Sequence, residues 1–203
     1  MVAYALLGGS GCTSLQVPAA AAVYDFGPTA LPADTRAPVR PMPAPALLLE
    51  PVQARAALDG TALQYRLAYA NAQQLRPYAQ ARWSMAPAEL LQQRLRSQLG
   101  AHRALLQDGQ GLVVPPGSLR LYVELDEFSQ VFDSPSHSHA LLRAHATLAQ
   151  LEASGYRLLA QRSFTLQRPA PTPDAAGGVQ ALGQASDALV SELLGWMDGA
   201  VAR

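Results

Sequence analysis

Hydrophobic and polar residues alternate most regularly over residues 119–126, where the sequence reads LRLYVELD. In an extended chain, one face of this segment would carry four apolar side chains, those of Leu119, Leu121, Val123 and Leu125. The pattern therefore predicts a strand with one buried face. Phe128 departs from the alternation, which indicates a bulge or the end of the strand.

Four other segments have the apolar content and the flanking turn residues of strands, namely residues 23–26, 46–52, 62–67 and 158–166. We expect the first to be a short edge strand and the second to be buried and closed by Pro51. Residues 139–151 are ambiguous, because their Ala and Leu content favours a helix whereas part of the segment alternates. Their position between two strand-like segments favours a strand.

Two segments have the spacing of amphipathic helices. The first has Pro87 in its first turn, Ser84 as the expected N-cap and Glu89 near the positive end of the helix dipole. Its buried stripe would consist of Leu91, Leu95, Leu99 and His102. The second begins at about Asp174, and its stripe would consist of Val179, Leu182, Leu189, Leu193 and Trp196.

Strands interleaved with two helices predict an α/β fold that borders on α+β. We expect a single compact domain in which two main helices pack on one mixed β-sheet. Six prolines within residues 27–45 predict an extended segment with a reach of several tens of ångströms, at about 3.1 Å per residue. A second proline break at residues 169–173 precedes the last helix.

The charge of the chain gives it no attraction for nucleic acid. The 203 residues include 15 basic and 15 acidic side chains, so the net charge is zero and no basic stripe is present. We therefore expect no nucleic-acid partner. All the basic residues are arginines, which we attribute to GC-rich coding rather than to function.

No motif in the sequence predicts catalysis or a cofactor. His137 and His139 have a spacing that could hold a metal, but no third ligand accompanies them, and a solvated loop explains them equally. Glu124, Asp126 and Glu127 could support acid–base chemistry or could belong to a solvated strand face. We expect no catalytic, cofactor-binding or metal-binding residue, no cofactor, and a protein that is not an enzyme.

Cys12, the single cysteine, follows an apolar run and the small residues GGSG. This order is typical of a bacterial lipoprotein, in which a short signal peptide is cleaved before a cysteine that receives acyl chains. We expect residues 1–11 to be the signal peptide, residues 12–23 a lipidated tether and residues 24–203 the folded domain. The leader has no charged residue and is shorter than usual. Either the true start lies upstream, or Cys12 is a buried thiol in a first strand.

The Arg82–Trp83 pair is the strongest candidate for a partner contact, because Trp and Arg are enriched at binding hot spots. A Trp at the entrance of a helix is also a common packing residue. The two alternatives predict opposite exposure for Trp83.

Several of these features occur in one order: the cysteine, Tyr24, Tyr65–Arg66, Arg82–Trp83 before the helix, the strand ending at Phe128, and the final helix. In this order the chain resembles the ABC-type transport auxiliary lipoproteins, of the paraquat-inducible protein C type. The resemblance implies a non-catalytic, periplasm-facing lipoprotein of a Gram-negative envelope. Such a protein assists a transport system that moves lipids between membranes.

The partners implied by the resemblance are the ABC transporter components and a mammalian-cell-entry type substrate-binding protein. Family members either self-assemble into homo-oligomers or dock on a periplasmic tunnel of that partner. Thr13 stands where an inner-membrane retention signal has Asp, so we expect the acylated Cys12 to lie in the outer membrane. A second hypothesis is a structural or regulatory envelope lipoprotein that activates another cell-envelope machine.

Overall fold

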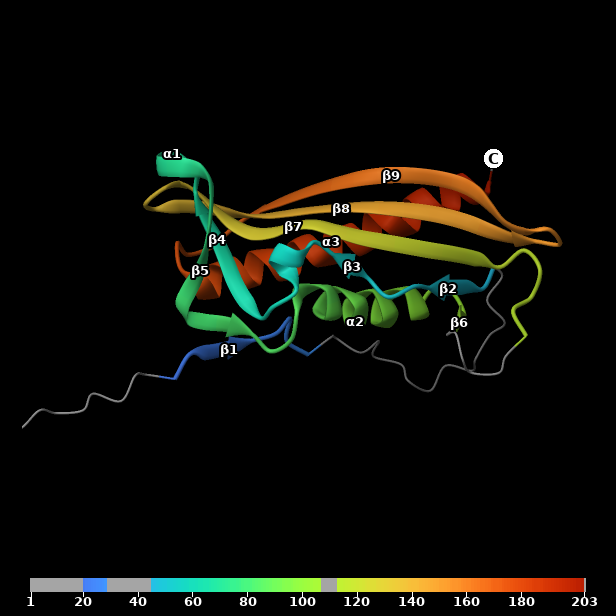
Figure 1. Cartoon of the computed structure of the whole chain (residues 1–203), viewed down its shortest axis with the longest axis horizontal. Coiled ribbons are helices and arrows are strands. Elements are labelled where there is room, and N and C mark those ends of the chain that lie inside the picture. The colour runs from blue at the N-terminus through green and yellow to red at the C-terminus, as the bar shows by residue number, and fades with distance from the viewer. Residues whose placement is uncertain (1–19, 29–44, 107–112, 203) are drawn as a thin grey trace, which may run out of the picture.

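The computed structural model describes residues 20–28, 45–106 and 113–202. Within them, a mixed nine-stranded sheet carries two long helices that pack against each other and against one face (Figure 1). The strands are β1 Ala22–Tyr24, β2 Leu47–Leu49, β3 Gln53–Ala54, β4 Ala62–Leu67, β5 Ala72–Trp83, β6 Leu105–Leu106, β7 Leu119–Ser134, β8 His137–Glu152 and β9 Gly155–Pro169. The helices are the 3₁₀ turn η1 Ala56–Leu58 and the α-helices α1 Ala68–Asn71, α2 Pro87–Gly100 and α3 Ala175–Val201.

β7 is the strand around which the sheet is organised. Along one edge it pairs antiparallel with β8 over nearly its whole length, and β8 pairs antiparallel with β9. Along its other edge it pairs in turn with three short parallel strands, β2, β3 and β4. β4 then continues antiparallel to β5, and β5 continues parallel to β1. The predicted α/β class with one mixed sheet is confirmed.

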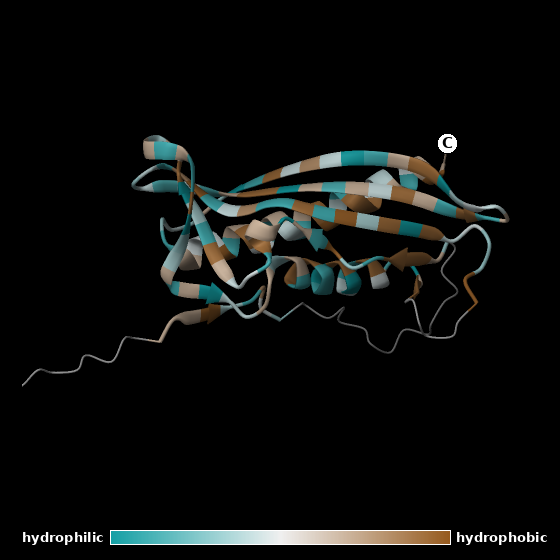
Figure 2. Ribbon diagram, viewed as in Figure 1, coloured by the Kyte–Doolittle hydropathy of each residue, from teal (hydrophilic) through white to brown (hydrophobic). Residues whose placement is uncertain are grey.

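The strands β7 and β8, which form a long hairpin, confirm the alternation predicted from the sequence. Hydrophobic and hydrophilic residues follow one another along β7, β8 and β9 (Figure 2). Leu119, Leu121, Val123 and Leu125 are all buried, and a register shift between Leu125 and Glu127 accounts for the changed parity at Phe128. The ambiguous segment is the strand β8, so its helical alternative was wrong.

The helices supply the other half of the core. Leu91, Leu95 and Leu99 of α2 are fully buried, as are Leu182, Leu189 and Leu193 of α3, whereas Val179 and Trp196 are only partly buried. Two details of the predicted first helix were wrong. Its N-cap is Ala86, not Ser84, and His102 lies beyond the end of the helix and is exposed. None of the helices in the described ranges is long and apolar enough to cross a membrane.

β5 was not predicted, because its sequence AQQLRPYAQARW has no alternation and contains Pro77. The strand tolerates this proline because only its last three residues pair on the side away from β4.

The edge strand expected near residue 23 is β1. Because β1 begins at Ala22, the sheet already includes residues 22 and 23, which we had placed in the tether. In the order of the chain, the proline-rich segment 27–45 lies between β1 and β2, within the range expected for the folded domain.

Candidate functional site

The predicted site residues lie in different environments. Cys12 is outside the described residues. Arg82 and Trp83 end β5, where they pair with Val23 and Tyr24 of β1. Arg82 is exposed, but Trp83 is completely buried, as its packing alternative predicts. In this conformation only Arg82 of the pair is available to a partner.

Trp83 belongs to an aromatic cluster that the N-terminal arm, residues 20–28, completes. The ring of Phe26 lies 5.8 Å from the ring of Trp83 and 6.1 Å from that of Phe128. The buried guanidinium of Arg94 on α2 lies 5.3 Å from the Phe26 ring, and its Nη2 donates to the Phe26 carbonyl oxygen at 2.9 Å. Nη1 of Arg94 also lies 3.4 Å from a carboxylate oxygen of Asp187 on α3.

Several hollows lie beside α2, and two of them are of similar size. One of about 340 Å³ lies between the segment after β2 and the helix, and its lining includes Val52, Met85 and Ala88. The other, of about 310 Å³, lies between the arm and α3, and its lining includes Phe26 and Arg94. Neither hollow gathers the nucleophile, base and oxyanion donors that acyl or phosphoryl transfer requires.

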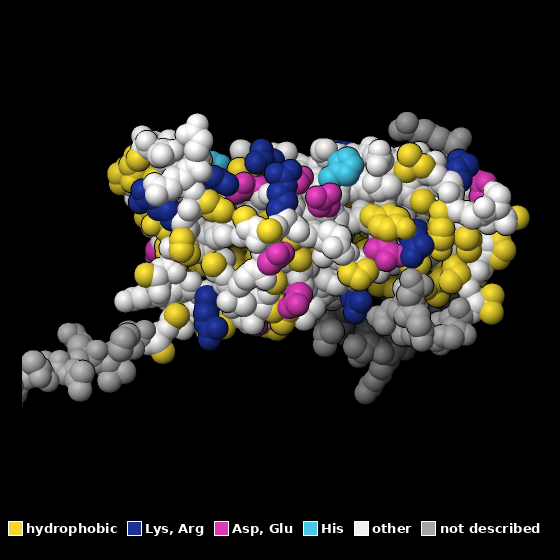
Figure 3. Space-filling model, viewed as in Figure 1, with side chains coloured by type: hydrophobic (Ala, Val, Ile, Leu, Met, Phe, Trp, Pro, Cys, Tyr) yellow, Lys and Arg dark blue, Asp and Glu magenta, His cyan; other side chains and the backbone are white. Residues whose placement is uncertain are grey.

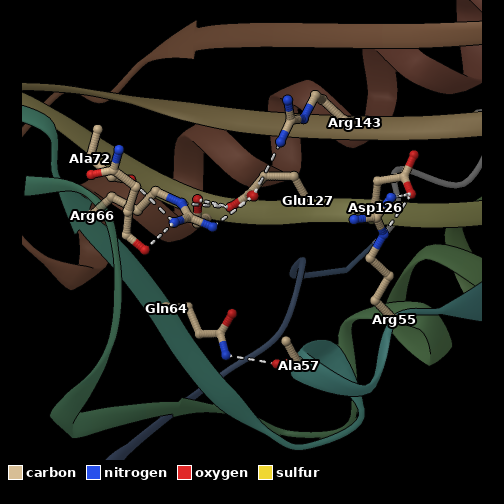
Figure 4. A network of polar contacts seen from close by, with 10 residues as sticks. Arg55, Ala57, Gln64, Arg66, Ala72, Asp126, Glu127 and Arg143 are labelled. Atoms are coloured by element: carbon tan, nitrogen blue, oxygen red, sulfur yellow. Dashed lines mark hydrogen bonds and ion pairs between the residues drawn. The ribbon is translucent and has the colours of Figure 1, made fainter.

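The face of the sheet opposite the helices carries a network of ion pairs (Figure 4). Glu127 of β7 is buried, and Arg66 of β4 donates to both of its carboxylate oxygens, at 2.9 and 3.2 Å. Ser129 donates to the same carboxylate at 2.6 Å, and Arg143 of β8 lies 3.5 Å from it. Since its oxygens are bonded to cations and a hydroxyl, Glu127 joins three strands and is not poised as a catalytic base.

The other acidic residues of this stretch face solvent. Asp126 pairs with Arg55 at 2.9 Å, and Glu124 is exposed. The solvated-face interpretation therefore holds for Glu124 and in part for Asp126, but it was wrong for Glu127. Sequence alone missed the burial of Glu127, because the bulge beside it changes which face it occupies.

The histidine pair lies at the tip of the β7–β8 hairpin. His139 Nδ1 is 2.8 Å from a carboxylate oxygen of Asp133, whereas His137 Nδ1 contacts the hydroxyl groups of Ser134 and Ser136. Across the described ranges, no three His, Cys, Asp or Glu side chains are grouped so that they could hold a metal ion.

An aromatic patch covers the opposite end of the same face. Tyr122 and Tyr156 are each 42% exposed and Leu158 is 56% exposed. The guanidinium of Arg120 lies 5.5 and 4.7 Å from the two tyrosine rings, and Arg120 also pairs with Glu50. Hydrophobic side chains gather over this end of the sheet, while acidic and basic side chains lie side by side near its middle (Figure 3).

Two ionisable groups near the start of α3 have shifted pKa values. Burial raises the pKa of the Tyr78 hydroxyl, which donates to Gln130 Oε1 at 2.8 Å; Tyr65 and Asp174 raise it further. Asp174 is the N-cap of α3, and hydrogen bonds from the Gly177 amide and the Thr172 hydroxyl lower the pKa of its carboxyl. The pKa shift of Tyr78 therefore follows from burial, and that of Asp174 from its hydrogen bonds as the helix N-cap.

The family model of the ABC-type transport auxiliary lipoprotein component matches residues 27–193. The chain belongs to this family. The auxiliary lipoproteins are described as components of ABC-type transport, which makes this chain an auxiliary transport component and places it in an envelope lipoprotein family. Among curated proteins, none matches the chain.

Solved structures share the fold of this auxiliary lipoprotein. Protein XCC0632 from Xanthomonas campestris, a DUF330 protein, is 21% identical with a TM-score of 0.65, and the match covers 80% of this chain and 89% of that one. The hypothetical protein CT253 from Chlamydia trachomatis is 10% identical with a TM-score of 0.53, over 77% and 97% of the two chains. These likenesses confirm the fold.

Proposed function

We propose that this chain is a non-catalytic, lipid-anchored accessory protein of an ABC transport system that moves lipids between the membranes of a Gram-negative envelope. The observation that supports this function is the match to the auxiliary lipoprotein family over most of the domain. The partners we propose are the transporter components and a mammalian-cell-entry type substrate-binding protein.

The anchor of this protein would be Cys12, which lies ten residues before β1. Each methylene of an acyl chain that enters the bilayer contributes about 0.8 kcal/mol of binding free energy, and stable attachment needs more than one chain. Thr13 after the cysteine favours the outer membrane as the site of the anchor. The folded domain would then face the periplasm and receive its partner there.

The first experiment measures the intact mass of the full-length protein from the membrane fraction of its native host, beside a Cys12→Ala variant. Cleavage before Cys12 with added acyl mass, absent in the variant, is the expected result. An unmodified species that retains residues 1–11 would contradict the anchor.

A second experiment tests the partner. The tagged full-length protein is purified from detergent-solubilised membranes, and transporter and substrate-binding components should co-purify with it. Recovery of another envelope machine in their place would support the regulatory hypothesis. Arg82→Glu should lower the recovery if Arg82 contacts the partner, whereas Arg96→Glu, a charge reversal at an exposed site on α2, is the matched control.

A further inference from the structure

The N-terminal arm is held at one place on the domain, which we call the slot. The slot consists of the end of β5 with Trp83, Phe128 of β7 and Arg94 of α2. Among the described strands, the arm's three-residue strand β1 pairs only with β5, and the amide of Ser84 donates to the carbonyl oxygen of Tyr24 at 2.8 Å. Val23 in the middle of β1 is 52% exposed. So short a strand, open to solvent on its outer side, adds little stability of its own.

Two side chains of the arm, those of Tyr24 and Phe26, pack against the hydrophobic core. Phe26 lies against Trp83 and Phe128, and Arg94 covers its ring and also binds its carbonyl oxygen. Trp83 lies on β5 and Arg94 lies on α2, so both residues belong to the domain and not to the arm, and they remain there whatever occupies the slot. The slot therefore offers a strand edge, an aromatic floor and a fixed guanidinium.

This chemistry recognises an extended peptide mainly by its backbone. Addition of a strand to a sheet edge uses main-chain hydrogen bonds for affinity and a pocket for specificity. Here the edge is the end of β5, and the pocket receives the aromatic residue two positions after the paired stretch. The side chains of Val23 and Asp25 are exposed, so the slot places little demand on them.

The covalent connections allow the arm to leave the slot. Sixteen residues, 29–44, separate the arm from residue 45, and at roughly 3.3–3.6 Å per residue they can span up to about 55 Å. The ends of this connection therefore do not force the arm to stay in the slot.

We propose that the slot is an exchangeable strand-addition site. The arm occupies it in the free protein, and an extended segment of a partner protein, with an aromatic residue two positions after its paired stretch, displaces the arm. The partner in this exchange is a component of the transport system, and that part rests on the proposed function. The arm is thus an intramolecular competitor for its own docking site.

A peptide of residues 20–28 with an N-terminal fluorophore tests the slot directly. It should bind full-length Phe26→Ala protein at least tenfold more tightly than wild-type protein, whose own arm fills the slot. A peptide with Ala in place of Phe26 should bind at least tenfold more weakly. Val23→Ala protein, altered at an exposed position of the same arm, should behave like wild type. Equal binding by wild type and Phe26→Ala protein would overturn the proposal.

Hydrogen exchange on the wild-type chain avoids any variant that fails to fold. Because the Ser84 amide is bonded to the arm, it should exchange at least a hundredfold faster than amides in the centre of β7 and β8. If the Ser84 amide hydrogen exchanges as slowly as those amides, the arm opens only when the whole domain unfolds. A partner segment could then not replace the arm, and the proposal would be overturned.

Competition tests the partner part. An excess of the 20–28 peptide should lower the recovery of co-purified transport components at least threefold, and the Phe26-substituted peptide should not. Unchanged recovery, with peptide binding to the slot established, would overturn the exchange with a partner. If no transport component co-purifies at all, the proposed function fails, while the peptide and hydrogen-exchange results still decide whether the slot is exchangeable.

Discussion

The two edges of β7 are built in different ways. On one edge a single strand, β8, pairs along almost the whole length of β7, and a hairpin turn connects the two. On the other edge β2, β3 and β4 divide the same length among them, and β5 and β1 attach only through β4. The first edge is held by one continuous local pairing, while the second is divided among short pairings with segments that are distant in the sequence. We expect the β8 side to carry the global stability and the other side to open locally.

The largest effect should come from the β8 side. Leu142 is fully buried in the centre of β8, opposite Phe128 of β7 and Leu166 of β9. Leu142→Ala should lower the free energy of unfolding by about 2–5 kcal/mol, because it removes buried methyl groups and leaves a cavity. Urea denaturation measures the change. Leu158→Ala on the exposed part of β9 should shift it by less than about 0.5 kcal/mol.

The link between the two sides should rank second. Glu127→Gln removes the charge that pairs with Arg66, so we expect a loss of about 2 kcal/mol, since Arg66 is mostly buried and keeps its own charge. Asp126→Asn breaks a pair whose arginine, Arg55, is 67% exposed, and should cost less than about 1 kcal/mol. Equal losses from the two variants would show that Glu127 has no special role in joining the strands.

The hydrogen bond of Tyr78 to Gln130 tests how much a single contact contributes to stability on the side of the short strands. Tyr78→Phe should cost about 1.5 kcal/mol at neutral pH, because the fully buried Gln130 loses a donor to Oε1. The raised pKa of Tyr78 adds a pH dependence: the unfolded chain loses the phenol proton above about pH 10, whereas the folded chain keeps it. Stability should therefore fall above about pH 10 in the wild type. Urea denaturation at pH 8 and pH 10.5 should show a smaller fall in the variant.

The smallest effect should come from the start of α3, the helix that packs on β8 and β9. Asp174→Ala removes the N-cap hydrogen bond to the Gly177 amide and should cost about 1 kcal/mol. Because the pKa of Asp174 is lowered in the folded chain, this contribution is present above about pH 4 and is lost as the pH falls through the folded pKa. Thermal denaturation at pH 7 and pH 2.5 measures both, and Asp174→Asn should retain much of the cap.

The same contrast explains what the sequence could predict. β7 and α3 have regular periodicity over many residues, so most of their burial follows from local pattern, whereas β8 alternates only in part and was predicted from its position between strand-like segments. β5 and the network at Glu127 depend on pairing between distant segments and on a one-residue bulge, which leave no periodic signal. For the candidate site, Trp83 could be singled out by residue type, but its burial depends on Phe26, which reaches it from another part of the chain.

The docking of β1 also sets the geometry of attachment to the membrane. If Cys12 is the anchored residue, only nine residues, 13–21, lie between it and Ala22 at the start of the sheet, so the tether spans at most about 35 Å. While the arm stays in its slot, the proline-rich segment adds nothing to that length. Release of the arm would extend the tether to the residues before β2, which begins at Leu47. The greatest distance between the anchor and the domain would then more than double. Three paired residues and one phenylalanine would thus decide how far from the membrane this protein can work.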